Sequence, residues 1–370
     1  MGYLTRSQHP IRVIIVEDSP IALLILRRML EGSDAIQVVG TARNGKEAIA
    51  LIPQVNPHVV CTDLHMPEMD GLTLTQEIMA AYPRPILAIS SSVRERDTQQ
   101  VFELLAAGAV DVFPKPEGGL GVDRDRIQRT LIQKIKILSG VSVFTHKRQP
   151  SDRQPLQANV QTPPVSSSTG RNTSFSRFYS HLGAIAIGAS TGGPQALQQI
   201  LRQLPANLPV PIICVQHISQ GFLQGFIDWL STDCQLPISI ARPGERPQPG
   251  TIYFPPERSH LLLDDCGRFT YSHETGVGGH CPSISLTFKA IARYYQRHSI
   301  AVLLTGMGRD GADGMLAISK AGGVTLAQNE ATCIVFGMPK EAIALGAVRQ
   351  VLPVEAIAPA ILHHLPQLSL

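Results

Sequence analysis

One serine in the second half of the chain stands where it could act as a nucleophile. Ser190 lies in the segment Gly188-Ala-Ser-Thr-Gly-Gly193, after the apolar run Ile185–Ile187 and before a helical pattern that begins at Pro194. Glycines on both sides of the serine allow a sharp turn that exposes its hydroxyl and lets a substrate approach the backbone. The N–H groups at the start of the following helix could then bind a developing oxyanion.

A nucleophilic serine also needs a base, and the base needs a group that orients it. His217 follows the apolar run Ile212–Gln216, and Asp310 comes soon after the run Ile300–Leu304. Because the carboxyl ends of parallel strands meet at one edge of a sheet, we expect these two residues to lie near Ser190. Among the other histidines, His280 is the alternative base.

Carboxylates in the first half of the chain also follow apolar runs. Glu17 and Asp18 come after the first run, and Asp63 comes after the third. Like charges at one sheet edge repel one another, and a divalent cation such as Mg²⁺ relieves that repulsion. Ser90 and Lys115, at the ends of the fourth and fifth runs, add a hydroxyl and a positive charge. This set predicts a site at which a carboxylate accepts a phosphoryl group.

The elements that would position this acidic site alternate along the first half of the chain. The expected strands are Arg12–Val16, Ile36–Gly40, Val59–Thr62, Ile86–Ser90 and Val110–Phe113. The expected helices are Pro20–Leu30, Gly45–Ile52, Leu72–Ala80, Asp97–Ala107 and Asp123–Leu138. Such alternation predicts an α/β fold with a doubly wound parallel sheet, whose ligand site lies outside the carboxyl ends of the strands.

The same alternation returns in the second half. The expected strands are Gly183–Gly188, Ile212–Gln216 and Ile300–Thr305, and the expected helices are Pro194–Leu204, Phe222–Leu230, Ser283–Arg297 and Gly311–Ala321. Shorter strands at Ile238–Ala241, Thr251–Phe254, His260–Leu263 and Arg268–Ser272 are expected to form a β-rich excursion at one edge. The second half is therefore predicted to be another doubly wound α/β domain with a mostly parallel sheet.

The stretch Thr145–Ser180 separates these halves. It is rich in Ser, Thr, Pro, Gln and Asn, it has few apolar residues, and it shows no periodicity. Such a segment cannot bury enough apolar surface to order itself. We therefore expect one domain at residues 10–138, a flexible linker at residues 139–180, and a second domain at residues 181–370.

Composition excludes several classes of function. The 370 residues carry a formal net charge of +3 and their basic residues are scattered, so no nucleic-acid partner is expected. No apolar run reaches the roughly 18 residues that a membrane span needs, and Met1–Pro10 lacks the apolar core of a signal peptide. Six cysteines without metal-ligand spacing suit a reduced protein. We expect a cytoplasmic monomer without membrane insertion.

Over roughly residues 10–138, the chain resembles the receiver domain of two-component response regulators. The resemblance is carried by Asp63-Leu-His-Met-Pro-Glu-Met-Asp-Gly71 together with Lys115-Pro116. It implies a five-stranded flavodoxin-like domain that is phosphorylated on Asp63 by a histidine kinase, with Ser90 and Lys115 as the switch residues. The Mg²⁺ ligands that it implies are Glu17, Asp18, Asp63 and the backbone carbonyl of His65. One departure is Val112, which stands where many receivers place a switching aromatic residue.

Several segments of the second half resemble the catalytic domain of chemotaxis protein-glutamate methylesterases, the CheB family. They are Gly188–Gly193, Gln216-His217, Tyr253–Pro256, His260–Leu263, Gly279–Ser283, Leu304–Ala312, Ala321–Gly323 and Val335–Pro339. By this resemblance Ser190 is the nucleophile, His217 the general base and acid, and Asp310 the orienting carboxylate. The N–H of Met307 would form part of the oxyanion hole, and Thr191 would support the serine–histidine geometry.

The resemblance implies a phosphorylation-activated esterase that hydrolyses glutamate γ-methyl esters on chemotaxis receptors and releases methanol. It also implies deamidation of receptor glutamines, and no cofactor for the esterase. The alternative is a phosphorylation-controlled adaptor without catalysis. Cys281 stands where the family often has an arginine, which leaves a substrate-carboxylate clamp there in question. Ser285 replaces a frequent acidic residue, and neither position is expected to touch the three catalytic side chains.

Overall fold

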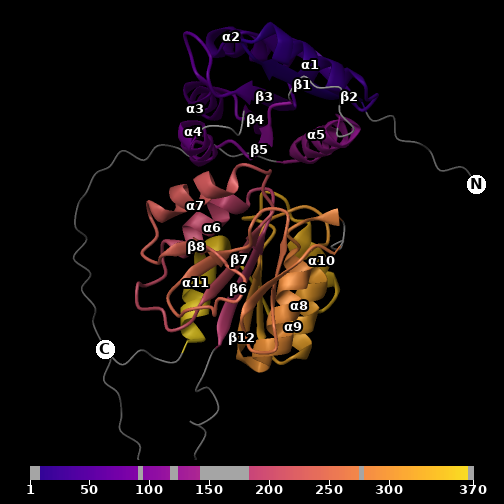
Figure 1. Cartoon of the computed structure of the whole chain (residues 1–370). Helices are drawn as coiled ribbons and strands as arrows, with labels where there is room; N and C mark the ends of the chain where they lie inside the picture. Colours follow the sequence, from indigo (N-terminus) through magenta and orange to yellow (C-terminus); the bar gives the residue numbers. More distant parts are fainter. Residues whose placement is uncertain (1–8, 91–94, 117–123, 142–182, 275–278, 366–370) are drawn as a thin grey trace, which may run out of the picture.

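The chain folds into two α/β parts, each built on its own parallel sheet (Figure 1). The computed structural model describes residues 9–90, 95–116, 124–141, 183–274 and 279–365. Nearly all of the expected linker, from residue 142 to residue 180, lies outside the described residues.

The first part holds a five-stranded parallel sheet in the order β2-β1-β3-β4-β5. Its strands are β1 (Ile11–Val16), β2 (Ile36–Ala42), β3 (Val59–Asp63), β4 (Ile86–Ser90) and β5 (Asp111–Pro114). This order confirms the predicted doubly wound sheet. It also makes β1 and β3 direct neighbours, so the acids that follow these two strands lie at one edge.

Helices cover both faces of this sheet. They are α1 (Pro20–Glu31), α2 (Gly45–Val55), α3 (Gly71–Ala81), α4 (Glu95–Ala106) and α5 (Arg124–Leu138). Side chains of α1 and α5 pack with Val13 and Ile15 of β1, whereas side chains of α2, α3 and α4 pack with Ile14 and Val16. Alternate residues of one buried strand thus serve the two faces, as a doubly wound sheet requires.

The second part holds a seven-stranded sheet in the order β14-β13-β12-β6-β7-β9-β8. Its strands are β6 (Ala184–Ala189), β7 (Ile212–Gln216), β8 (Ile238–Ile240), β9 (Ile252–Phe254), β12 (Ser299–Leu303), β13 (Val324–Gln328) and β14 (Gln350–Leu352). All neighbouring pairs in it are parallel. The three central strands, β12, β6 and β7, are the ones that precede Asp310, Ser190 and His217.

Two sets of helices sandwich the second sheet. Helices α6 (Gly193–Leu201), α7 (Leu223–Ser231) and α11 (Val354–His363) pack on the face that Ile185 and Ile187 present. Helices α8 (Ile284–Tyr295), α9 (Ala312–Lys320) and α10 (Met338–Ala344) pack on the face that Ala186 presents. Figure 1 shows the two sets on opposite sides of the strands.

The middle of the second half forms short strands at one edge of the sheet, as expected. Strands β8 and β9 are the last two strands at that edge and pair in parallel, whereas β10 (His260–Leu263) and β11 (Phe269–Ser272) form a separate antiparallel pair. The parallel pairing was not predicted, since short runs do not reveal which neighbour they pair with. Elements β13, β14, α10 and α11 were not expected at all.

Within the described residues, no helix is both long and apolar enough to cross a membrane.

Candidate functional site

Ser190 lies in a tight turn between β6 and α6, as its glycine-rich surroundings predict. The Gly193 N–H donates to the Ser190 carbonyl oxygen at 2.7 Å, and Gly192 has a left-handed φ of 76°. The Ser190 N–H donates to the carbonyl oxygen of Thr305 at 3.0 Å, which ties the turn to the loop after β12. A Cβ on Gly193 would lie 2.1 Å from the side-chain oxygen of Gln216, so only glycine fits there.

Gln216 links the turn of Ser190 to the residue after β7. Its side-chain N–H₂ donates to the carbonyl oxygens of Ser190 and His217, both at 2.8 Å. The residue before Ser190, Ala189, is the register partner of Gln216, so Ser190 and His217 leave the sheet side by side. Sequence reasoning did not assign Gln216 a role, although its place as the last residue of a strand was visible.

His217 and Asp310 form a buried pair. The distance from His217 Nε2 to Asp310 Oδ2 is 3.0 Å, and both side chains are at most one-tenth exposed. His217 Nδ1 is buried and makes no hydrogen bond within the described part of the chain. With Nε2 held by the carboxylate, Nδ1 is the ring nitrogen that can accept a proton. The Ser190 hydroxyl makes no hydrogen bond to the imidazole among the described residues.

The Asp310 carboxylate is held at the start of α8. It accepts hydrogen bonds from the Ser283 hydroxyl at 3.0 Å and from the N–H groups of Ile284 at 2.8 Å, Ser285 at 2.9 Å and Gly311 at 2.9 Å. Burial by itself would raise the pKa of Asp310, but the hydrogen bonds from His217 and Ser285 hold that pKa well below its usual range. The carboxylate therefore stays ionised and fixes the orientation of the ring.

Two further residues support this pair and were missed from the sequence. Ser285 was expected not to touch the three predicted side chains, and that expectation was wrong. Its N–H donates to Asp310, and its hydroxyl oxygen accepts the Gly311 N–H at 2.7 Å. The fully buried His260 accepts the N–H of Ser283 on Nδ1 at 2.9 Å, which positions the N-cap of α8. Both roles depend on how α8 packs against the strand ends.

His280 stacks on His217, with ring centroids 4.3 Å apart and the ring planes inclined by 9°. Desolvation, together with His217 and Lys134, lowers the pKa of His280 to about 4, although Asp310 acts in the opposite direction. A neutral ring therefore covers one face of His217. Of the two stacked rings, His217 is the one held by the Asp310 carboxylate, and its role as the base stays a prediction.

Thr191 and Met307 lie in the loops that follow β6 and β12. The Met307 N–H makes no hydrogen bond within the described part of the chain, and the Met307 side chain is 37% exposed. The Thr191 hydroxyl bonds to neither Ser190 nor His217 among the described residues. It donates instead to Asp111 Oδ2 in the first part of the chain, at 3.1 Å. Roles for Met307 in an oxyanion hole and for Thr191 in the serine–histidine geometry stay predictions.

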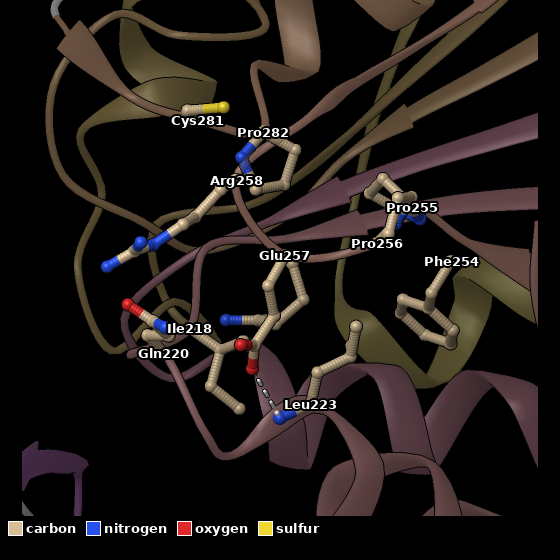
Figure 2. Close-up of a pocket in the computed structure, with 11 residues that line it drawn as sticks. Ile218, Gln220, Leu223, Phe254, Pro255, Pro256, Glu257, Arg258, Cys281 and Pro282 are labelled. Carbon is tan, nitrogen blue, oxygen red and sulfur yellow. Dashed lines mark hydrogen bonds between the residues drawn. The ribbon is translucent and has the colours of Figure 1, made fainter. Parts of the chain in front are cut away.

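A pocket opens beside the histidine pair (Figure 2). Gln216 and Ile218, which flank His217, form part of its wall, and Cys281 and Pro282, which follow His280, form another part. The remaining lining residues are Gln220, Leu223, Phe254, Pro255, Pro256, Glu257 and Arg258.

The acidic site of the first part has the predicted composition. Lys115 Nζ lies 2.8 Å from Glu17 Oε1 and 2.7 Å from Asp63 Oδ2. Burial by itself would lower the pKa of Lys115, but its hydrogen bonds to Asp63 and Glu17 outweigh burial and raise it. Ser90, the buried last residue of β4, accepts the Lys115 N–H on its carbonyl oxygen at 2.7 Å. His65 is exposed just after β3.

A metal ion fits this site. Ligand atoms of Glu17, Asp18 and Asp63 all lie within 4.8 Å of one another. Glu17 Oε2 is buried without a hydrogen-bond partner among the described residues, and burial with the nearby Asp63 charge raises the pKa of Glu17. A hard cation such as Mg²⁺ would satisfy that orphaned oxygen and offset the carboxylate repulsion.

Polar contacts join the two parts of the chain beside Ser190. Asp111, which accepts the Thr191 hydroxyl, also forms an ion pair with Lys134 of α5 at 2.5 Å. The Gln195 amide of α6 donates to the carbonyl oxygen of Ala109 at 2.9 Å. The first part therefore lies directly over the turn that carries the proposed nucleophile.

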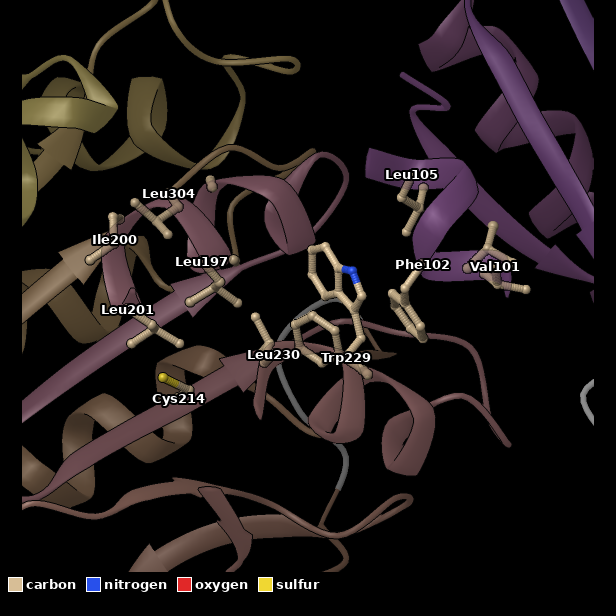
Figure 3. Close-up of a cluster of buried hydrophobic side chains, with 14 of the residues drawn as sticks. Val101, Phe102, Leu105, Leu197, Ile200, Leu201, Cys214, Trp229, Leu230 and Leu304 are labelled. Carbon is tan, nitrogen blue, oxygen red and sulfur yellow. The ribbon is translucent and has the colours of Figure 1, made fainter. Parts of the chain in front are cut away.

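An apolar contact extends this interface. Phe102 of α4 packs against both Phe226 and Trp229 of α7, with ring centroids 5.4 Å and 5.5 Å away. Phe102 and Phe226 are fully buried, and Trp229 is 7% exposed. Figure 3 shows Phe102 and Trp229 with Leu105 and Leu197, in one apolar cluster that contains residues of both parts of the chain.

Comparison with known proteins identifies both parts. A family model described as CheB methylesterase matches residues 185–361, and one described as response regulator receiver domain matches residues 13–131. A protein-glutamate methylesterase/protein-glutamine glutaminase of Hahella chejuensis is 40% identical, over 96% of this chain and 98% of that protein. The chain belongs to the CheB methylesterase family. A relative from Nitrosospira multiformis with the same activities in its name is 38% identical over 95% of this chain and 96% of its own length.

Among solved structures, the CheB methylesterase catalytic domain of Thermotoga maritima is 36% identical. It covers 48% of this chain and 96% of that chain, with a TM-score of 0.47. The similar full-length CheB relatives are named as enzymes, which speaks against the adaptor alternative.

Proposed function

We propose that this CheB-family chain hydrolyses glutamate γ-methyl esters on chemotaxis receptors and deamidates receptor glutamines. The observation that carries the proposal is the buried His217–Asp310 pair, which follows two strands that flank the strand before Ser190. A hydroxyl, a base and an orienting carboxylate at one sheet edge form the set that nucleophilic acyl transfer requires. The names of the similar relatives supply the substrate class.

In the first half of the reaction, Ser190 Oγ attacks the ester carbonyl carbon while His217 Nδ1 takes the hydroxyl proton. Asp310 keeps the proton on Nε2 and stabilises the imidazolium that forms. The negative charge on the carbonyl oxygen would be met by the Met307 N–H. Collapse of the tetrahedral intermediate breaks the bond to the methoxy group. His217 returns the proton to this oxygen, so methanol leaves and a glutamyl-serine ester remains.

In the second stage of the reaction, His217 takes a proton from water, and the hydroxide that forms attacks the acyl carbon of the glutamyl-serine ester. The ester bond to Ser190 breaks, the serine regains its proton, and glutamate leaves. A glutamine side chain can follow the same route with ammonia as the leaving group, which is why one site serves both reactions. Neither route needs a cofactor in the cleft.

We also propose that the receiver part restrains the esterase until Asp63 is phosphorylated. The contacts of Asp111 with Thr191 and of Phe102 with Trp229 support this, since they hold the receiver over the cleft. Phosphorylation could release the restraint only by changing the free-energy difference between two arrangements, one with the receiver over Ser190 and one with the receiver moved away. Ser90 and Lys115, close to the phosphoryl oxygens, would link the modification to the interface.

Phosphorylation of Asp63 would use Mg²⁺ held by Glu17, Asp18, Asp63 and the carbonyl oxygen of His65. The ion supplies charge neutralisation for the incoming phosphoryl group. Lys115, already within 2.7 Å of Asp63, would bind a phosphoryl oxygen. We propose a histidine kinase as the phosphodonor, and the cytoplasm as the place where the chain meets this kinase and the receptors.

The test is methanol release from chemoreceptors carrying methyl esters, measured with and without acetyl phosphate and Mg²⁺. Ser190→Ala should lower release by about 10⁴-fold or more, because it removes the nucleophile. Ser319→Ala, near the opposite end of α9 from the cleft, is the matched control and should leave release unchanged. Equal release by the Ser190→Ala variant and the unaltered chain would overturn the proposal.

A further inference from the structure

The pocket beside His217 has an apolar floor and two charged residues at its rim. The floor is formed by Ile218, Leu223, Phe254, Pro255, Pro256 and Pro282. The charged residues, Glu257 and Arg258, are adjacent in the chain, yet their surroundings differ. Those surroundings decide what the pocket can bind.

The charge of Glu257 is engaged within the protein. Its Oε1 accepts the Gly221 N–H at 2.7 Å and, as Figure 2 shows, the Leu223 N–H, at 3.4 Å. These N–H groups belong to the start of α7, where a carboxylate is favoured by the helix dipole. Glu257 therefore ties the loop after β9 to the segment after His217 through one of its two carboxylate oxygens.

Arg258 is exposed and its guanidinium forms no ion pair within the described part of the chain. Figure 2 shows the guanidinium extended away from the Glu257 carboxylate. Its backbone has a left-handed φ of 61°, a conformation that favours glycine or asparagine and costs a bulkier residue about 1 kcal/mol or more. Backbone geometry alone therefore does not explain why an arginine stands here.

We propose that this pocket is a subsite for the acidic protein segment that surrounds the scissile ester, with Arg258 pairing a carboxylate next to the methylated glutamate. The assignment rests on the proposed function. The apolar floor would bind an aliphatic side chain of the same segment. Hydrolysis of a methyl ester leaves a glutamate carboxylate, so a neighbouring methylation site that has already reacted carries a negative charge. A guanidinium can bind such a carboxylate through two parallel hydrogen bonds.

Arg258 would thus supply the positive charge for a substrate carboxylate that Cys281 cannot supply. Cys281 lines the same pocket and carries no charge at neutral pH, since desolvation raises the pKa of its thiol. The loop after β9 supplies Arg258, whereas the segment before α8 supplies Cys281. The cation of the pocket therefore comes from a different segment from the one that carries Cys281.

The experiment compares two versions of a methylated chemoreceptor cytoplasmic fragment, one native and one with the acidic residues flanking each methylation site changed to glutamine. Full-length protein is assayed for methanol release with acetyl phosphate and Mg²⁺. The unaltered chain should show a KM about three- to tenfold lower for the acidic fragment. Arg258→Gly, which suits the left-handed backbone, should bring the two KM values together without changing kcat on the glutamine fragment. Arg258→Lys should keep part of the preference.

Arg202→Ala, an exposed arginine at the far end of α6, is the matched control and should keep the full preference. The inference is overturned if the unaltered chain treats both fragments alike or if Arg258→Gly retains the preference. Those failures differ from a failure of the proposed function, in which the unaltered chain releases methanol from neither fragment and both proposals fall.

Discussion

The hydroxyl of Thr191, the residue next to the proposed nucleophile, donates to Asp111 of the receiver part at 3.1 Å. Asp111 is the first residue of β5 and is also paired with Lys134 of α5. One carboxylate thus joins the receiver face to the catalytic turn. Any movement of β5 or α5 changes a contact that is one residue from Ser190.

Asp111→Asn should raise methanol release in the absence of a phosphodonor. The substitution weakens a charge-assisted hydrogen bond of about 1.5–3 kcal/mol, so the open arrangement should become roughly tenfold or more populated. Release in the presence of acetyl phosphate should change little, because the contact is absent once the receiver has moved. Unchanged basal release would contradict a restraining role for this contact.

Asp63→Asn should abolish stimulation by acetyl phosphate and leave basal release within about twofold. The substitution keeps the shape of the side chain but removes the attacking carboxylate oxygen. A chelator of divalent cations added to the unaltered chain should give the same loss of stimulation without lowering basal release. Stimulation that survives in the Asp63→Asn variant would show that another residue accepts the phosphoryl group.

Asp310→Asn should lower kcat by about 10³–10⁴-fold, because the amide favours the wrong histidine tautomer. Ser283→Ala removes only one hydrogen bond to Asp310 and should cost far less. The measurement is single-turnover methanol release at saturating enzyme. Comparable losses in the two variants would indicate that the helix start, rather than the carboxylate, carries the effect.

The depressed pKa of Asp310 also predicts a pH dependence of stability. The folded state binds a proton on Asp310 less readily than the unfolded chain does, whose carboxyl has an ordinary value of 3.8. The contribution of Asp310 is therefore complete above about pH 5 and is lost as the pH falls toward the lower, folded-state pKa. Urea unfolding of the unaltered chain and of Asp310→Asn should differ by a constant amount above about pH 5, and the difference should narrow progressively as the pH falls below about 3.8.

His280 should titrate at a lower pH than an ordinary surface histidine. Its ring resonances should show a midpoint near 4, because desolvation and the neighbouring His217 disfavour its charge. As the pH falls from about 6.5, the unfolded chain takes up this proton first, so the lowered pKa costs stability between about pH 6.5 and 4. His280→Phe keeps a flat ring against His217 and should remove that loss of stability. A midpoint near 6.5 would contradict the stacked geometry.

Much of the site could be predicted because it follows one rule of parallel sheets. Ser190, His217 and Asp310 each come after a buried apolar strand, and such strand ends meet at one edge. Glu17, Asp18 and Asp63 were predictable for the same reason. These positions need only the identity of the strands and their order.

What could not be predicted depends on packing between segments distant in the chain. The Asp310 carboxylate lies against the N-terminus of α8 because α8 crosses the sheet near β12, and no local pattern encodes that. The hydrogen bond from Thr191 to Asp111 joins two domains, and the sequence pattern within one domain does not predict its contacts with the other. The strand partners of β8 and β9 could not be predicted because a three-residue strand has too little pattern to fix its partner.

The aromatic cluster of Phe102, Phe226 and Trp229 has a thermal consequence. Separation of the two halves would bring buried rings into water, so release of the restraint has a positive heat-capacity change. Apolar association weakens on cooling, so the contact between the two parts of the unphosphorylated protein should be weakest at low temperature. Because Trp229 is the single tryptophan of the chain, its emission reports how far the halves have parted at each temperature.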